Sequence, residues 1–386
     1  MALQEVPIPT PRVRAPSARL FSLDVFRGAT IAAMILVNNP GNEFSYAPLN
    51  HAEWNGWTPT DLIFPFFLFI VGVSLTLSYR ARIERGGSRH TLLMHSIRRS
   101  AIIFLIGLFL NGFPHFNLAT WRVAGVLQRI ALAYLAASVI ALYCETRGII
   151  ASIAVLLFGY WVAMRFIPIP GIGMPGTDVA INDPNANLSW YLDKLYLPGA
   201  MYEKTRDPEG ILSTLPAIAT ALIGVLTGKW LGKNIDATKK AGGMLLAGVL
   251  GIIAGQFWHL WFPINKKLWT SSFVLFTAGY ALVALAACYW FCDVKLRRGW
   301  WTKPFVVFGT NAIAAYVLAD VVSSLLFNLQ VPSGRDVRSL QESLYRTCFS
   351  QVTSKPFGSL LYSIAFVLLC WLPIYWMFRR RIFLKI

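Results

Sequence analysis

The chain has 386 residues, of which 56% are hydrophobic and only 14% are charged. Soluble globular chains are about 45–50% apolar and about 25% charged, so this composition excludes intrinsic disorder, a coiled coil and an ordinary soluble enzyme. The formal net charge of +17 would suggest a nucleic-acid partner in a soluble protein, but here we attribute it to Lys and Arg that anchor cytoplasmic loops and expect no nucleic acid.

The charges gather in short blocks that separate long apolar stretches, which is typical of a polytopic membrane protein. Each stretch is long enough to cross about 30 Å of hydrocarbon as a helix. We therefore predict an all-α transmembrane bundle of about ten spans in one domain, residues 21–386, after a cytoplasmic tail at 1–20. The tail has no long apolar segment, so a cleavable signal peptide is not expected. The predicted spans are 21–39, 61–79, 97–113, 126–144, 149–167, 211–228, 242–262, 269–290, 304–327 and 357–377.

The distribution of basic residues predicts the orientation of these spans. Of the 35 Lys and Arg, 22 fall in segments on the N-terminal side of the bundle, 11 fall on the opposite side, and Arg27 and Arg129 lie within spans. This bias favours a cytoplasmic location for both termini. The long segments 40–60, 168–210 and 328–356 are then extracytoplasmic, and loops of this size on one face of a rigid bundle commonly carry function.

The first span carries polar groups at both ends. Asp24 and Arg27 share one helix face and can neutralise each other, either as a structural pair or as part of a site for a phosphorylated ligand, to which Arg is well suited. Asn38 lies at the far end, before Asn39-Pro40-Gly41. Asn at this position is either a helix cap or a group facing the extracytoplasmic loops.

His51 follows in a segment dense in polar and aromatic residues, near Glu53, Trp54, Asn55 and Asp61. Asp61 is expected in the first turn of the second span. An imidazole beside carboxylates that can orient it suits proton transfer or nucleophilic attack. The alternative is a structural histidine at the membrane interface.

Three other sets of polar residues stand out. Gln128 and Arg129 begin the fourth span, and Glu209 precedes the sixth in Asp207-Pro208-Glu209-Gly210, where a turn with an acidic cap is the alternative interpretation. In the ninth span Asn311, Tyr316 and Asp320 are predicted to share one face, which favours a cavity over lipid. The five cysteines form no CxxC pair, so we expect free thiols and no metal site.

Several of these segments resemble the heparan-α-glucosaminide N-acetyltransferase family of transmembrane acetyltransferases. The resemblance begins with RLFSLDVFRGATIAAMILVNNPG and HAEWNGWTPTDLIFPFFLFIVGVS. It continues, in order, through GVLQRIALAY, DPEGILSTLPAI, LWTSSFVLFTAGYAL, FGTNAIAAYVLAD and RRRIFLKI. It extends over nearly the whole chain from Arg19 to Ile386.

The resemblance implies that acetyl-CoA from the cytoplasm donates its acetyl group to the amine of a terminal glucosamine on the far side of the membrane. The family's active-site histidine matches His51 and its neighbouring asparagine matches Asn38. The carboxylate near the start of that helix matches Asp24, and the glutamate of the DPEG motif matches Glu209. The animal enzymes have an eleventh span and His-Glu where this chain has Ala319-Asp320. The compact form implies a bacterial cytoplasmic (inner) membrane protein.

We therefore predict an acetyl-CoA-dependent N-acetyltransferase that acts on an amino-sugar or oligosaccharide acceptor, with a homodimer left open. His51 is either a general base in a ternary complex or a nucleophile that carries the acetyl group. Asn38 is a donor to the oxyanion. The predicted site comprises His51, Asn38 and Asp61 for catalysis; Asp24, Arg27, Gln128, Arg129 and Asn311 for the donor; and Glu53, Trp54, Asn55 and Glu209 for the acceptor.

The rival hypothesis is a transporter or permease for a sugar or another small molecule, which the span number fits equally well. A transporter gathers its polar groups at mid-membrane, often where helices break, whereas Asn38, His51, Asp61 and Glu209 are predicted at one surface. A membrane scaffold leaves the charges within spans without a role.

Overall fold

The structure of the chain is a computed structural model that describes residues 20–333, 336–351 and 354–384. The tail predicted at 1–20 lies outside these residues except for Leu20. The long helices follow the apolar runs of the sequence, because a backbone in lipid must satisfy its own hydrogen bonds. They are α1 (Phe21–Asn38), α2 (Ile63–Ile83), α3 (Arg89–Gly112), α4 (Val126–Tyr143), α5 (Thr146–Phe166), α7 (Thr214–Leu231), α8 (Ala237–His259), α9 (Ser271–Tyr289), α11 (Ala312–Asn328) and α13 (Lys355–Arg379).

Shorter elements connect or extend these helices. A 3₁₀ turn, η2 (Pro59–Leu62), leads into α2, and a π turn, η3 (Trp290–Val294), ends α9. Outside the bundle, two short antiparallel strands form a pair in which Gln330 lies opposite Ser339. The remaining elements are η1 (Ala47–Leu49), α6 (Leu188–Tyr196), η4 (Trp300–Thr302), α10 (Lys303–Thr310), β1 (Gln330–Ser333), β2 (Asp336–Ser339) and α12 (Leu340–Cys348).

The prediction of an all-α polytopic bundle is confirmed. Within the described residues, nine helices are long and apolar enough to cross a membrane, and a bent pair brings the number to ten if it is one span. The bent pair corrects the prediction of a continuous ninth span at 304–327. It joins 300–310 to Ala312–Asn328 at an angle of 80°, so Asn311 lies at a break and does not share a helix face with Tyr316 and Asp320.

The break at Asn311 is held by the C-terminal segment of the chain. The Asn311 side chain donates to the carbonyl of Ile382 at 3.0 Å and accepts from the N–H of Leu384 at 3.1 Å. These bonds satisfy an amide that is only 1% exposed, as a buried polar group requires. The apolar run is continuous across the break, which is why its hydropathy alone predicts one straight helix.

Glycines allow the central helices to approach closely. A Cβ on Gly72 of α2 would lie 1.9 Å from the Ala221 carbonyl oxygen of α7, and one on Gly224 would lie 2.1 Å from the Phe69 carbonyl oxygen. Real side chains do not fit at such distances, so the two backbones touch directly, as is common where membrane helices pack. The α2–α7 seam is therefore packed backbone against backbone at these two positions.

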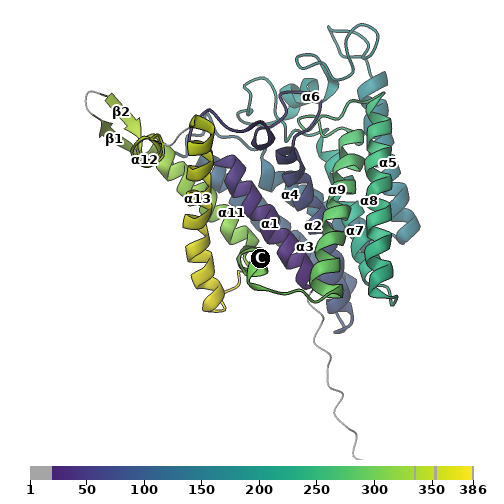
Figure 1. The fold of residues 1–386 in the computed structure, drawn as a ribbon. Helices are drawn as coiled ribbons and strands as arrows, with labels where there is room; N and C mark the ends of the chain where they lie inside the picture. Colours follow the sequence, from purple (N-terminus) through teal and green to yellow (C-terminus); the bar gives the residue numbers. More distant parts are fainter. Residues whose placement is uncertain (1–19, 334–335, 352–353, 385–386) are drawn as a thin grey trace, which may run out of the picture.

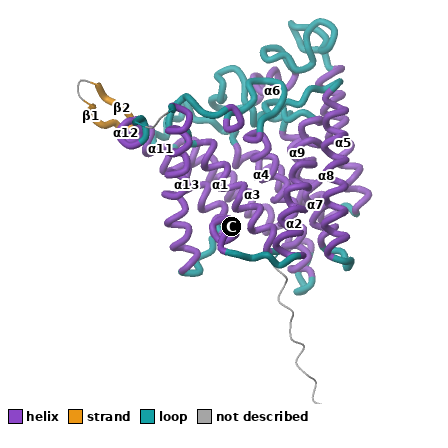
Figure 2. Tube along the Cα trace, in the orientation of Figure 1, coloured by secondary structure: helices purple, strands orange, loops and turns teal. Residues whose placement is uncertain are grey.

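The bundle has two unlike faces (Figures 1 and 2). We call the one that carries the segments 39–62, 167–213, 329–333 and 336–351 the loop face. The other, which we call the termini face, holds the start of α1 and the end of α13, at the bottom of Figure 1. Leu20 and Leu384 thus lie on the same side of the bundle, as an even number of crossings requires.

Candidate active site

A cavity of about 490 Å³ opens at the loop face, and we call it the His51 cavity. Its walls come from the loop-face ends of α1, α2 and α4, from the segments 202–209 and 266–269, and from Tyr316 of α11. Charged and polar groups from distant parts of the sequence meet here. They are Asn38, His51, Glu53, Asp61, Arg122, Glu203, Glu209, Lys266 and Lys267.

The turn at the start of α2 places the imidazole of His51 against Asp61. Asp61 and Thr58 form a capping box at η2, in which Asp61 Oδ2 accepts from the Thr58 N–H at 3.0 Å. The same oxygen accepts from the Ala52 N–H at 3.0 Å, and Asp61 Oδ1 lies 2.7 Å from His51 Nδ1. Asp61 Oδ1 only accepts and the Lys266 ammonium only donates, so Nδ1 bonds to Asp61 when it carries the proton and to Lys266 when it does not. In the tautomer that bonds to Asp61 the lone pair of His51 is on Nε2, and the side chain is 51% exposed.

Lys266 completes this group and was not predicted as a site residue. Its Nζ lies 2.9 Å from His51 Nδ1 and 3.3 Å from Asp61 Oδ1. Burial lowers the pKa of the Lys266 ammonium below its ordinary value, although the Asp61 carboxylate acts in the opposite direction. The ammonium balances the buried Asp61 charge.

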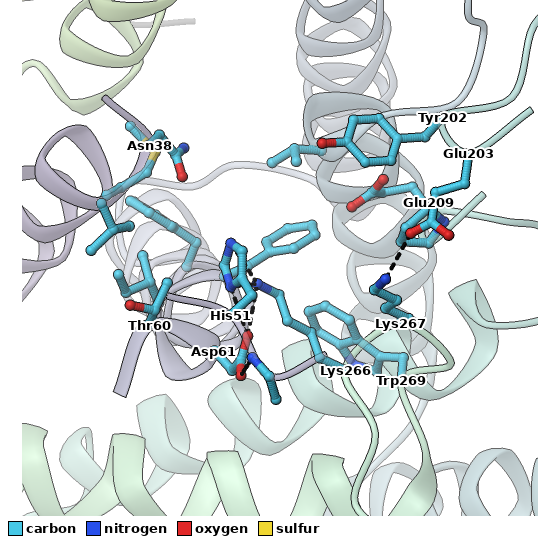
Figure 3. A pocket seen from close by; sticks show the side chains of 18 of the residues that line it. Asn38, His51, Thr60, Asp61, Tyr202, Glu203, Glu209, Lys266, Lys267 and Trp269 are labelled. Carbon is cyan, nitrogen blue, oxygen red and sulfur yellow. Dashed lines mark hydrogen bonds and ion pairs between the residues drawn. The ribbon is translucent and has the colours of Figure 1, made fainter. Parts of the chain in front are cut away.

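Two adjacent asparagines at the end of α1 have different roles. The Asn39 side chain donates to the Ile35 carbonyl at 2.8 Å and is 7% exposed, so it caps the helix. Asn38 is exposed and lines the His51 cavity. Asn39 therefore supplies the cap considered for Asn38, which leaves the Asn38 amide facing the cavity (Figure 3).

The opposite wall of the cavity is built around Arg122. Arg122 Nε lies 2.7 Å from Asp207 Oδ2, and its Nη2 lies 2.5 Å from Glu209 Oε2. Burial lowers the pKa of Arg122, but the two carboxylates more than offset this and raise it above its ordinary value. Asp207 also accepts from the Glu209 N–H at 2.9 Å. Two carboxylates on one guanidinium thus fix the position of Glu209 beside the cavity.

A second buried cluster lies behind this wall. Arg129 is 1% exposed, donates to Ser213 Oγ and lies over the Trp269 ring at 5.2 Å. Asp193 accepts from the Ile211 N–H at 2.7 Å. Burial raises the pKa of Asp193 to about 6, while the Ile211 N–H and Arg129 act to lower it. These contacts hold the segment that carries Glu209.

Among the residues predicted for the acceptor, Glu53 and Glu209 line the cavity, but Trp54 and Asn55 do not. Trp54 Nε1 donates to the Asn182 carbonyl at 2.9 Å, and Asn55 Oδ1 accepts from Asn182 Nδ2 at 2.6 Å. Both residues fasten the His51 segment to the long loop before α6. In the described structure their contacts are structural.

The five residues predicted for the donor are not brought together. Gln128 and Arg129 lie in the first turn of α4, near the loop face. Asp24, Arg27 and Asn311 lie on the other half of the bundle, where Arg27 donates to the Gly309 carbonyl at 3.0 Å and to Ser74 Oγ at 2.8 Å. Arg129 lies at the loop-face end of α4. The predicted orientation of this span already implied that position.

A second cavity, of about 580 Å³, opens at the termini face, and we call it the cationic cavity. It lies between the ends of α2, α4 and α7, and four cations and two carboxylates line it. It shares no lining residue with the His51 cavity. Its charged residues are Arg80, Glu84, Arg89, Glu145, Lys229 and Lys233.

The fold and the His51 cavity together define a multi-pass membrane protein with an imidazole–carboxylate–ammonium site at one face. The family described as heparan-alpha-glucosaminide N-acetyltransferase, catalytic, matches residues 19–255. The chain is 32% identical over 363 residues to the human heparan-alpha-glucosaminide N-acetyltransferase, covering 80% of this chain and 54% of that protein. The mouse enzyme of the same name is 32% identical over 368 residues, covering 81% and 55%.

The chain therefore belongs to the heparan-alpha-glucosaminide N-acetyltransferase catalytic family. It spans about half the length of the curated relatives that it matches.

Proposed function

We propose that the protein transfers an acetyl group from cytoplasmic acetyl-CoA to the amine of an extracytoplasmic, glucosamine-like sugar. Support comes from the family membership and, above all, from the contact of 2.7 Å between His51 Nδ1 and Asp61 inside a cavity. In this proposal the loop face is extracytoplasmic, in accord with the distribution of Lys and Arg. We also place the protein in a bacterial inner membrane.

In the proposed reaction the amine nitrogen attacks the thioester carbonyl carbon and the carbon–sulfur bond breaks. His51 Nε2 takes the proton of the attacking amine, while Asp61 holds Nδ1 and stabilises the imidazolium. The CoA thiolate leaves and is protonated, so acetyl-CoA and an amine give an N-acetyl sugar and CoA. Asn38 donates to the carbonyl oxygen as negative charge develops on it.

A two-step route uses the same residues. Nε2 first attacks the thioester and CoA leaves, and the amine then takes the acetyl group from the imidazole. An acetylated His51 that forms with acetyl-CoA alone supports this route. Acetyl transfer that needs both substrates at once supports direct attack.

We place the charged part of the donor at the cationic cavity. Phosphates are too polar to cross lipid, and Arg80, Arg89, Lys229 and Lys233 provide cations on the expected cytoplasmic side. Arg27 is a weaker candidate, since its side chain is 24% exposed, against 56% for Arg80, and its guanidinium binds Gly309 and Ser74. Because the two cavities share no lining residue, a donor that reaches from one to the other requires the helices between them to shift.

A transporter is the second candidate, and the helix break at Asn311 favours it, because broken helices are common at transport sites. The Asn311 amide, however, is occupied by the backbone of Ile382 and Leu384. The charged residues of the His51 cavity lie at one surface, which suits a reaction between substrates from two sides.

The test is an assay of purified protein with labelled acetyl-CoA and glucosamine, with detection of the N-acetylated product by mass spectrometry. We expect the labelled product and free CoA in equal amounts. Uptake of labelled glucosamine into proteoliposomes, without an acetylated product, would instead establish the transporter.

A further inference from the structure

The seam between α10 and α13 carries cations that no nearby part of the sequence balances. Lys303 begins α10, and Arg379 ends α13 at the termini face. Both side chains are exposed, and within the described residues neither forms an ion pair. The sequence has no Asp or Glu from 294 to 319 or from 343 to 386. This part of the termini face therefore has a surplus of positive charge that attracts an anion.

Aromatic side chains bring the two cations to the same place. Lys303 Nζ lies over the Tyr375 ring, 5.5 Å from its centroid. Tyr375 stacks on Trp371 with centroids 4.5 Å apart, and Trp371 Nε1 donates to the Pro304 carbonyl at 3.3 Å. Trp371, Tyr375 and Arg379 follow one another at intervals of four residues, so they share one face of α13. Arg379 thus lies one helical turn beyond the ring that Lys303 covers.

This row of side chains changes from charged to apolar with depth. Trp371 lies eight residues before Arg379, which is about 12 Å along the helix from the termini face. α13 stands at the edge of the bundle (Figure 1). The adjacent row of its side chains, Leu368, Leu372 and Trp376, is 57–60% exposed. A large apolar surface on a membrane span faces lipid, so the seam is open to the bilayer on this side.

The order of these groups indicates the class of ligand. A phospholipid has its phosphate at the membrane surface and its acyl chains in the interior, in the same order as the cations and the aromatic row. Lys and Arg bind phosphate through charge-assisted hydrogen bonds, and aromatic rings are enriched at the level of the headgroups. Trp300, three residues before Lys303, is 88% exposed and suits the same interface. Because the local charge is positive, a headgroup with a net negative charge fits better than a zwitterionic one.

We propose that the α10–α13 seam binds one anionic phospholipid of the leaflet at the termini face. Its phosphate lies between Lys303 and Arg379, and an acyl chain lies along Tyr375 and Trp371. A lipid at this position holds the end of α13, from which the C-terminal segment leads to the helix break at Asn311. The inference does not depend on the proposed acetyl transfer.

The test is native mass spectrometry of the purified protein with equal amounts of phosphatidylglycerol and phosphatidylcholine. We expect the wild type to bind phosphatidylglycerol about 30-fold more tightly, at roughly fivefold for each of the two cations. Lys303→Gln/Arg379→Gln should bind the two lipids within twofold of each other. Each single variant should lose about fivefold, which keeps the comparison possible if the double variant does not fold.

The matched control is Arg147→Gln/Lys239→Gln, which removes two exposed cations of the termini face outside the seam and should keep the full preference. Equal affinity of the wild type for both lipids, or an unchanged preference in Lys303→Gln/Arg379→Gln, would overturn the proposal. An equal loss in the control would also overturn it, because the preference would then come from diffuse surface charge. Release of bound phosphatidylglycerol by an equal concentration of inorganic phosphate or CoA would assign the cations to a soluble anion instead.

Discussion

The His51 cavity and the cationic cavity hold similar numbers of charged groups but use them differently. In the first, three ion pairs match most of the charges: Lys266 lies 3.3 Å from Asp61, Arg122 lies 2.5 Å from Glu209, and Lys267 lies 2.7 Å from Glu203. In the second, four cations face two carboxylates. Matched, partly buried pairs fix side chains in place for chemistry, whereas a surplus of cations on a water-exposed rim attracts a mobile anion.

The largest effect is expected from His51→Ala, which removes the only group that we assign to proton transfer. The rate of acetyl transfer should fall by about 10²–10⁴-fold, while binding of CoA at the other cavity stays intact. Product formation and CoA-induced thermal stabilisation are the two measurements. His90→Ala, an exposed histidine at the termini face, is the matched control, and near-normal turnover in His51→Ala would contradict the assignment.

Asn38→Ala should follow, with a loss of about 10²–10³-fold in kcat, as for one lost oxyanion donor. Asn39→Ala tests whether the two neighbouring asparagines have different roles. It removes the cap to Ile35 and should lower the unfolding temperature with little effect on kcat. Steady-state kinetics and thermal unfolding of both variants decide this, and the reverse pattern would refute it.

Lys266 provides a prediction for the pH dependence of the rate. Burial lowers its pKa, so its charge is lost at a lower pH than that of an exposed lysine. If this charge supports Asp61 and His51, wild-type kcat declines on the alkaline side, and Lys266→Arg, which stays charged, removes the decline. Lys266→Met should be about tenfold slower at neutral pH. An unchanged alkaline limb in Lys266→Arg would contradict this role, and Lys267→Met, whose partner is Glu203, is the control.

Substitutions in the cationic cavity should affect only the binding of acetyl-CoA. Replacing both Lys229 and Lys233 with Gln should raise the KM for acetyl-CoA roughly three- to tenfold, as expected for two exposed charges, and leave kcat within twofold. The effect should shrink at high salt, since ions screen exposed charges. Arg147→Gln removes a nearby exposed cation outside this lining, and an equal effect there would argue against a specific donor site.

The smallest effect concerns stability and Asp193. Its pKa is raised to about 6 by burial, against about 3.9 in an unfolded chain. The folded state therefore binds this proton more tightly, and its contribution to stability is present below about pH 4 and lost as the pH rises through about 6. Asp193→Asn should reduce the fall in unfolding temperature between pH 4 and pH 7. An identical pH dependence in the variant would contradict the raised pKa.

Most of the bundle could be predicted from the sequence because each apolar run is bounded by charged or turn residues. The break at Asn311 could not, since the contacts that hold it come from Ile382 and Leu384, about 70 residues further along the chain. Hydropathy reports only on neighbours in the sequence, so it cannot detect a bend imposed by a distant segment.

For the same reason, only part of the site could be predicted. Asp61 lies ten residues from His51, and their contact follows from a local capping box. Lys266 lies 215 residues from His51, and as a basic residue beside a span it looks like an ordinary interface anchor. The sequence also could not decide which of Asn38 and Asn39 caps α1, because an asparagine side chain suits both a helix cap and the wall of a polar cavity.

The central claim is a reaction between substrates on opposite sides of the membrane, and a sided assay tests it most directly. Protein is reconstituted into sealed vesicles of known orientation, with labelled acetyl-CoA supplied only at the termini face and glucosamine only at the loop face. We predict that labelled N-acetylglucosamine accumulates on the loop-face side while CoA stays on the other. Product that forms only when both substrates are on one side would contradict the account.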